Sequence, residues 1–343
     1  MKVWLPSVRA RSGSDVYVER LAAALRLRGV DAVVQWFPHI LQYCPWALRL
    51  YPPPAGVDVI DTNSWLAFAF RNEATPLVVN ALHCVAGRGY PAWKSFPQAI
   101  FHDHMVRRFE RASFRGADAT VAISDSTSRE VREDYGVTDV HTIPLWVDTE
   151  IFSPPPNAVK PGTAHGGRIL IVGNMSRRKG GDLVGPFCEA LGQDFEVTVI
   201  AGLRGSAPRV SSHGAGLRFI SGLSTEQLVA AYRETDVVAS LSRHEGFGYT
   251  ALEGMACGKP VIAFDVSGLR DVVDHGETGF LVPVEDIRAL AGFCRRFRDD
   301  SDLARQFGAK GRQRAVTVFS QERAIEAHLR LYADLLSSRG PRT

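Results

Sequence analysis

The stretch "DVVASLSRHEGFGYTALEGMACGKPVIAF", residues 236–264, decides how the second half of this chain folds. It begins with a short apolar run rich in β-branched residues, which is typical of a buried strand. Gly246 and Gly248 interrupt that run, and helix-forming residues then continue as far as Gly258. A second apolar run starts at Val261. The order predicts strand, glycine turn, helix and strand, which is a βαβ unit.

Two carboxylates lie in this unit, Glu245 in the turn and Glu253 about a turn and a half into the helix. Ligands of such units bind at the carboxyl ends of the strands, where Glu245 is expected. The start of the helix offers free N–H groups and partial positive charge, which suit a phosphate. Glycines let the backbone approach that phosphate closely. The alternative, that each Glu is a solvated helix residue, stays open from the spacing alone.

The composition describes a soluble globular protein of 343 residues with 45% hydrophobic residues, a length that predicts two domains. A net charge of +3 is too small to indicate nucleic acid as a partner, although it allows contact with an anionic membrane. Five scattered cysteines without a C-x-x-C pattern indicate reduced thiols in the cytosol. We expect no signal peptide, because Pro6 and Arg9 interrupt the first apolar run, and no membrane-spanning segment.

Strands alternate with helices on both sides of a segment rich in proline and glycine, residues 152–167. This alternation predicts an α/β protein with two doubly wound parallel-sheet domains, which face one another across a cleft. The segment at 152–167 is the best candidate for the linker. No G-x-G-x-x-G follows the first expected strand, which weighs against a dinucleotide-dependent oxidoreductase.

The segment "HEGFGYTALEGMACGKPVIAFDVSGLRDVVDHGETGFLVP", residues 244–283, resembles the signature of the retaining glycosyltransferases of family 4, which have the GT-B fold. The resemblance is strongest over residues 165–335 and weaker over 1–150. It implies three parts, listed in chain order: a Rossmann-like acceptor-binding domain over 1–152, a Rossmann-like donor-binding domain over 165–325, and a C-terminal helix over 326–343 that packs back on the first domain.

The resemblance also implies roles for the residues around the glycine turn. Glu253 corresponds to the glutamate that accepts hydrogen bonds from the ribose hydroxyls of the nucleotide. Glu245 corresponds to the glutamate beside the donor sugar, and Phe247 and Gly248 to backbone donors for the sugar and the diphosphate. A carboxylate accepts hydrogen bonds and does not donate them, so it suits two neighbouring hydroxyl groups.

The segment "VGNMSRRKGG", residues 172–181, is similar to the family's strand-end motif G-R-L-x-x-x-K-G. Lys179 corresponds to the lysine that neutralises the diphosphate. Asn174 stands where the family usually has arginine, so the missing charge has to come from elsewhere. Arg178 or Arg177, in the same motif, is the nearest candidate to supply it. Arginine can bind a phosphate with two hydrogen bonds. Both arginines could instead be solvated surface residues.

Three further positions correspond to the family's donor site. Gly13 lies in a polar turn that resembles the glycine-rich loop after the first strand, which approaches the diphosphate. His83 ends an expected strand and corresponds to a histidine beside the donor sugar, although such a histidine is often structural. Leu223 matches the place where backbone groups meet the base.

The implied reaction moves a sugar from a nucleotide diphosphate sugar to the hydroxyl of a glycan or lipid-linked acceptor, in surface polysaccharide or lipid glycan synthesis. Attack comes from the face of the leaving group, with Glu245 orienting the sugar. We expect no cofactor and no metal, because the implied mechanism needs neither. The one D-x-D, Asp300–Asp302, falls in a polar loop between expected helices and is interpreted as surface charge. Two alternatives stay open: a GT-B relative of another class, such as an epimerase or an inverting transferase, and a non-catalytic nucleotide-sugar binder.

Two segments of the first half could contact a membrane. Residues 41–54 are aromatic and apolar with one arginine, and residues 101–115 form a basic amphipathic pattern. A packed loop and a core-facing helix explain the same patterns. The expected compartment is the cytoplasm, and the expectation includes peripheral attachment at the inner face of the membrane.

Overall fold

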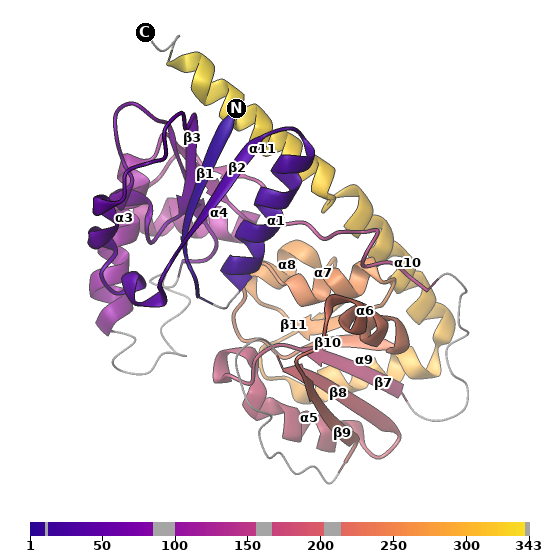
Figure 1. Ribbon diagram of the computed structural model, residues 1–343. Helices are drawn as coiled ribbons and strands as arrows, with labels where there is room; N and C mark the ends of the chain where they lie inside the picture. Colours follow the sequence, from indigo (N-terminus) through magenta and orange to yellow (C-terminus); the bar gives the residue numbers. More distant parts are fainter. Residues whose placement is uncertain (11–12, 85–99, 156–166, 202–213, 340–343) are drawn as a thin grey trace. The chain divides into compact units, whose positions relative to one another are not determined.

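A computed structural model describes residues 1–10, 13–84, 100–155, 167–201 and 214–339 (Figure 1). The chain forms two compact units: Met1–Leu145 together with Gln321–Thr343 make the first, and Trp146–Ser320 the second. Each unit contains a six-stranded sheet, and every pairing between named strands is parallel. The expected α/β class with two parallel sheets is confirmed. The expected linker lies in the second unit, and its residues 156–166 fall outside the described ones.

The first sheet has the strand order β2-β1-β3-β4-β5-β6. Its strands are β1 (Lys2–Val8), β2 (Asp31–Phe37), β3 (Val59–Asn63), β4 (Leu77–Ala81), β5 (Ala119–Ala122) and β6 (His141–Thr142). The helices of this unit are α1 (Gly13–Leu27), α3 (Arg107–Gly116), α4 (Asp125–Tyr135) and α11 (Gln321–Ser338), with the short turns η1 (His39–Gln42), η2 (Pro45–Leu50) and η3 (Ala67–Ala69) and the π-helical η5 (Phe101–Val106).

The central strands of the first sheet are apolar because both of their faces are covered. Strands β4 and β5 are buried along their whole length, as expected of parallel strands between two layers of helices. Helix α4 has a conventional start and end: the Ser124 hydroxyl accepts a hydrogen bond from the Thr127 N–H at 3.1 Å, and Gly136 ends the helix at φ +71°. These signals place α4 between β5 and β6.

A buried polar network holds α11 on the first sheet. The Tyr332 hydroxyl of α11 donates to Asp61 Oδ2 of β3 at 2.6 Å, and Asn80 of β4 donates to Asp61 Oδ1 at 2.6 Å. The Tyr17 hydroxyl of α1 donates to Asn80 Oδ1 at 3.0 Å. Four elements distant in sequence are therefore joined through one carboxylate. Figure 1 shows α1 and α11 beside the strands of this sheet.

The second sheet has the strand order β12-β11-β10-β7-β8-β9. Its strands are β7 (Gly167–Val172), β8 (Phe195–Ala201), β9 (Gly216–Ser221), β10 (Val237–Ser240), β11 (Val261–Phe264) and β12 (Gly279–Val282). The helices of this unit are α5 (Val184–Leu191), α6 (Thr225–Glu234), α7 (Tyr249–Ala256), α8 (Ser267–Val272), α9 (Ile287–Asp299) and α10 (Ser301–Thr317), with the short turns η6 (Arg177–Lys179) and η7 (Gly181–Leu183).

The βαβ unit expected at residues 236–264 is present as β10, α7 and β11. Strands β10 and β11 are parallel neighbours, with Val238 opposite Val261. Helix α6 begins with a capping box, because the Ser224 hydroxyl accepts from the Gln227 N–H at 3.3 Å while Gln227 Oε1 accepts from the Ser224 N–H at 2.9 Å. Within the described residues, no helix combines the length and the apolar character needed to cross a bilayer.

Candidate active site

The site residues of the second unit gather where β7 and β10 end. These two strands are parallel neighbours, so their carboxyl ends lie at the same edge of the sheet. The segments that follow them contact each other directly, because the Arg243 N–H donates to the Arg178 carbonyl at 2.8 Å. At Gly180, which has φ +74°, a Cβ atom would lie 2.2 Å from the Leu241 carbonyl oxygen, so only glycine allows this approach.

Glu245 lies at the centre of this contact and is 8% exposed. Its Oε1 atom accepts hydrogen bonds from the Lys179 ammonium and, at 2.8 Å, from the Ser242 hydroxyl. Arg178 Nη1 lies 3.9 Å from Glu245 Oε2 and also donates to the His244 carbonyl at 3.0 Å. The structure therefore brings together three of the predicted residues, as a buried Glu245 carboxylate paired with two half-buried cations, Lys179 and Arg178.

The electrostatics of the cluster keep Glu245 ionised. Burial favours the neutral acid, but the charges of Lys179 and Arg178 and the hydrogen bonds from Lys179 and Ser242 outweigh it and hold the pKa of Glu245 below its ordinary value. Burial, reinforced by the charge of Arg178, lowers the pKa of the neighbouring His244 to about 4. At neutral pH the site thus holds a carboxylate that only accepts hydrogen bonds and a neutral imidazole.

Arg243 fastens the two segments together and was not predicted from the sequence. Its guanidinium is 2% exposed and donates to Asp182 from Nη1 at 2.6 Å and from Nη2 at 2.9 Å. It also donates from Nε to Glu285 at 2.5 Å and from Nη1 to the Arg177 carbonyl at 2.5 Å. The hydrogen bonds from Arg243 lower the pKa of Asp182. An arginine directly before His-Glu at a strand end was the available signal.

Glu253 lies in α7 and is 7% exposed. Its Oε2 atom accepts a hydrogen bond at 3.0 Å from the hydroxyl of Tyr232, a fully buried residue of α6. This bond sets the direction of the carboxylate. A side chain held in this way is preorganised, so a ligand hydroxyl would find its acceptor already in place.

Phe247 and Gly248 form the turn that leads into α7. The Phe247 ring is 3% exposed and packs edge to face on Tyr249 and Phe319, with centroids 5.8 Å and 5.6 Å away. Gly248 has φ +105°, and a Cβ atom there would lie 2.9 Å from Leu269 Cδ2. The turn is therefore fixed by packing on one side and by a glycine-only backbone conformation on the other.

The other predicted residues lie in less enclosed places. Asn174 follows β7 and is half-buried, and its Oδ1 atom accepts from the Ser176 N–H at 3.2 Å. Leu223 is half-buried in the turn between β9 and α6. In the first unit, Gly13 is the exposed first residue of α1, where the sequence had indicated a turn, and His83 is half-buried after β4. The roles assigned to these four residues stay predictions.

The described residues include no group of three or more histidine, cysteine or acidic side chains that could hold a metal ion. The D-x-D at residues 300–302 has a structural use. Asp300 Oδ1 accepts from the Leu303 N–H at 2.9 Å and caps α10, while Asp302 pairs with Arg305 on the surface. The two acids are thus engaged in the first turn of a helix.

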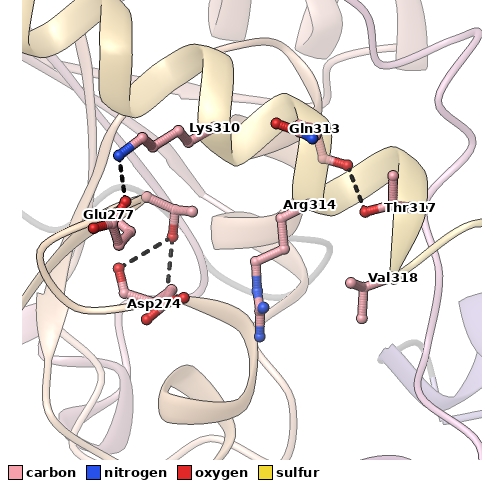
Figure 2. A pocket seen from close by; sticks show the side chains of 8 residues that line it. Asp274, Glu277, Lys310, Gln313, Arg314, Thr317 and Val318 are labelled. Carbon is pink, nitrogen blue, oxygen red and sulfur yellow. Dashed lines mark hydrogen bonds and ion pairs between the residues drawn. The ribbon is translucent and has the colours of Figure 1, made fainter.

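An open groove of about 460 Å³ lies beside α10 and contains none of the predicted residues. Figure 2 shows Lys310 of α10 paired with Glu277, and within the loop that holds Glu277 the Asp274 N–H donates to the Thr278 hydroxyl at 2.9 Å. The loop that holds Asp274 and Glu277 leads into the start of β12. The groove therefore lies at the amino edge of the parallel sheet, opposite to the edge where β7 and β10 end. The groove is therefore distinct from the cluster around Glu245.

Comparison with known proteins covers both units. The profile described as "Glycosyl transferases group 1" matches residues 166–314, and the profile "Glycosyltransferase Family 4" matches residues 34–151. The D-inositol 3-phosphate glycosyltransferase of Xylanimonas cellulosilytica is 28% identical, with 98% of this chain and 95% of the relative aligned. The enzyme of the same name from Jonesia denitrificans is 30% identical over 90% of this chain and 88% of its own.

Solved structures resemble the chain along nearly its whole length. Sucrose-phosphate synthase from Thermosynechococcus elongatus has a TM-score of 0.83 at 22% identity, covering 98% of this chain and 100% of that one. The protein HepE from Anabaena, solved with UDP-glucose, has a TM-score of 0.74 at 16% identity, with coverages of 98% and 100%. At these identities the likeness concerns the fold.

Proposed function

Since the chain belongs to glycosyltransferase family 4, has the GT-B fold and is a transferase, we propose that it moves a sugar from a nucleotide diphosphate sugar to an acceptor hydroxyl with retention of configuration. The acceptor in this proposal is a glycan or a lipid-linked sugar, as in the synthesis of surface polysaccharide or lipid glycans. Two relatives are named D-inositol 3-phosphate glycosyltransferase and alpha-maltose-1-phosphate synthase, and those names describe these relatives alone.

The observation that carries the proposal is the cluster in which the half-buried Lys179 and Arg178 face the buried carboxylate of Glu245. Burying charges is costly unless they are paired, and Glu245 pairs with both cations. A diphosphate brings its own negative charge to the same place and competes with Glu245 for Lys179. Once Lys179 turns to the diphosphate, Glu245 can accept hydrogen bonds from the hydroxyls of the sugar. The pair is thus the resting arrangement of a donor site.

Glu253 extends the site toward the nucleoside. Its carboxylate is buried and oriented by Tyr232, so it can accept hydrogen bonds from the two ribose hydroxyls without reorganisation. We assign the N–H groups at Phe247 and Gly248, where α7 begins, to the diphosphate and the sugar. Arg178 supplies the charge that an arginine at position 174 would have given.

The chemical demand is to stabilise the negative charge that develops on the leaving nucleoside diphosphate. Lys179, Arg178 and preorganised N–H groups meet this demand. The sugar develops oxocarbenium character, as in glycoside hydrolysis. A phosphate oxygen of the leaving group takes the proton of the acceptor hydroxyl, which attacks from the same face. Glu245 is ionised and held by Lys179 and Ser242, so it orients the sugar without attacking it.

Thermal-shift measurements with UDP-, GDP-, ADP- and dTDP-glucose test the donor class. A ligand at a hundred times its Kd stabilises the folded state by about 2.7 kcal/mol, so one base should raise the melting temperature clearly. Lys179→Gln should abolish that rise, whereas Lys310→Gln, which removes an exposed ion-paired lysine of the same unit, should keep it. Absence of any rise for all four donors would contradict the proposal.

The anomeric configuration of the product tests the reaction class separately. Proton NMR of the product should show the configuration of the donor sugar, and the reaction should continue in excess EDTA. An inverted product would identify an inverting transferase. A donor sugar changed at one carbon, with no transfer, would identify an epimerase.

A further inference from the structure

The first unit carries an exposed apolar surface made from two segments that are distant in sequence. Residues 38–51 include η1 and η2, and residues 100–116 include η5 and α3. Six of the twelve exposed large hydrophobic side chains among the described residues belong to them: Ile40, Tyr43, Trp46, Leu50, Tyr51 and Ile100. Exposed apolar side chains concentrated in this way mark an interaction site more often than scattered ones do.

The two segments pack on each other and form one surface, which we call the aromatic–arginine surface. Tyr43 contacts Phe101 and Trp46 contacts Phe109, with ring centroids 5.5 Å and 6.1 Å apart. Phe68 of η3 stacks on Phe109 at 5.3 Å and carries the Arg49 guanidinium over its ring at 5.7 Å. Tyr43 and Trp46 stay about half exposed, while Phe109 beneath them is buried.

The charges on this surface are mainly positive. Arg108, Arg111 and Arg115 are exposed on α3 and follow one another at helical spacings of three and four residues, so they share one face. Asp103 is exposed beside them, whereas Glu110 is fully buried and accepts hydrogen bonds from Ser64 and Tyr135. No aspartate or glutamate occurs between residues 32 and 57. An apolar patch therefore adjoins a basic helix face.

We propose that the aromatic–arginine surface docks the enzyme on an anionic lipid bilayer. Tyrosine and tryptophan side chains favour the boundary between headgroups and acyl chains, and arginines beside them are attracted to anionic headgroups. A second copy of this chain fits less well, because a twofold interface would bring one basic helix face against another. The inference goes beyond the proposed function, since docking requires no sugar transfer.

Co-sedimentation with vesicles of phosphatidylcholine alone, or mixed with phosphatidylglycerol, tests the docking. The bound fraction should be high on the mixed vesicles, low on phosphatidylcholine alone, and should fall as salt is added. Leu50→Ser should reduce the partition coefficient roughly tenfold. Leu27→Ser is the matched control, because Leu27 is 78% exposed on α1 and Leu50 is 82% exposed.

The basic face is tested by a pair of double variants with the same change of net charge. Arg108→Gln with Arg111→Gln should weaken binding to the mixed vesicles about thirtyfold, while Arg28→Gln with Arg288→Gln, at exposed positions elsewhere, should change it less than threefold. Equal binding to both kinds of vesicle, or equal loss in test and control variants, overturns the proposal. So does self-association that Leu50→Ser abolishes in sedimentation velocity, since a second copy would then cover the surface.

Discussion

The two units each bury a carboxylate at a parallel sheet, but they treat its charge in opposite ways. Burial raises the pKa of Asp61 in the first unit to about 7, although Tyr332 and Asn80 donate hydrogen bonds to it. In the second unit Glu245 is also buried, yet its pKa lies below the ordinary value. The difference is the partners: neutral donors surround Asp61, whereas Lys179 and Arg178 face Glu245.

This contrast separates a structural network from a site prepared for a charged ligand. Neutral donors fix a side chain in place without supplying charge to anything else. Cations gathered around a buried carboxylate, in contrast, bring charge that an anionic ligand can use when it binds. We therefore expect changes around Glu245 to alter the rate of transfer, and changes around Asp61 to alter the stability of the first unit.

Glu245→Gln should have the largest effect and tests the contrast most directly. Glutamine keeps the shape of the side chain but removes the charge that pairs with Lys179 and one of the strong acceptor groups for the sugar. We expect kcat to fall between about a hundredfold and a thousandfold, measured as initial rates with saturating donor.

The matched control for that substitution is Glu277→Gln, which removes an exposed carboxylate paired with Lys310 in the same unit. Its kcat should stay within about twofold of the wild type, because this ion pair lies outside the cluster around Glu245 and exposed ion pairs contribute little to stability. A Glu245→Gln enzyme with unchanged kcat and a lower melting temperature would make the cluster structural, and the contrast between the units would disappear.

Asp61→Asn should reveal the cost of the buried acid in the first unit. The folded protein holds a proton on Asp61 up to about pH 7, and the unfolded chain releases it near the ordinary value of 3.8. Between these values the folded state binds more protons, so the stability contributed by Asp61 falls as the pH rises. The free energy of unfolding of the wild type, minus that of Asp61→Asn, should therefore decrease by about 3 kcal/mol between pH 4 and pH 7.

Urea unfolding at a series of pH values measures this difference. Asp139→Asn, at a 90% exposed side chain, is the matched control. His328, whose pKa burial lowers to about 4, acts in the opposite direction over the same range, but it is present in both proteins and largely cancels from the difference. A difference that rises with pH would mean that Asp61 is ionised in the folded state, as Glu245 is.

The sequence was informative where the partners of a residue are close along the chain. Glu245 and the turn at Gly248 lie within one βαβ unit, so spacing and residue type predicted their common place at a strand end. Lys179, 66 residues away from Glu245, was assigned to the donor site only through the family resemblance. Gly13 was predicted to lie in a turn, but it is the first residue of α1. The Ala10 N–H donates to Asp15 Oδ1 in the first turn of that helix, and no simple sequence pattern marks such a bond.

Long-range partners that no family motif marks were not predictable from one sequence. Arg243 meets Asp182 and Glu285, which are 61 and 42 residues away, and Tyr332 meets Asp61 across 271 residues. No periodicity connects such positions, because the sheet topology alone brings them together. The same applies to the contact of Tyr43 with Phe101, which joins two patterns that the sequence presented separately.

Arg243→Lys should have an intermediate effect, because it keeps the charge and loses the fork of donors. A lysine cannot reach Asp182, Glu285 and the Arg177 carbonyl together, so the segment that carries Lys179 and Arg178 becomes less well positioned. We expect kcat/KM for the donor to fall about tenfold, mainly through KM. Arg305→Lys, in an exposed pair with Asp302, should leave both constants unchanged. A drop in melting temperature with unchanged KM would show that Arg243 serves stability alone.

Tyr332→Phe should have the smallest effect and examines the contrast from the side of the first unit. It removes the hydroxyl that donates to Asp61 at 2.6 Å and changes little else in the buried contact of α11 with the sheet. The loss of one such hydrogen bond destabilises a protein by about 1 kcal/mol, visible as a lower melting temperature. Tyr51→Phe, at a tyrosine that is 45% exposed, should leave the melting temperature unchanged.

Because neutral donors supply no charge to a ligand, kcat at a temperature where both proteins are folded should be that of the wild type. A tenfold lower kcat in Tyr332→Phe, with an unaltered melting temperature, would mean that the network under α11 takes part in transfer and that the two units do not divide the work in this way.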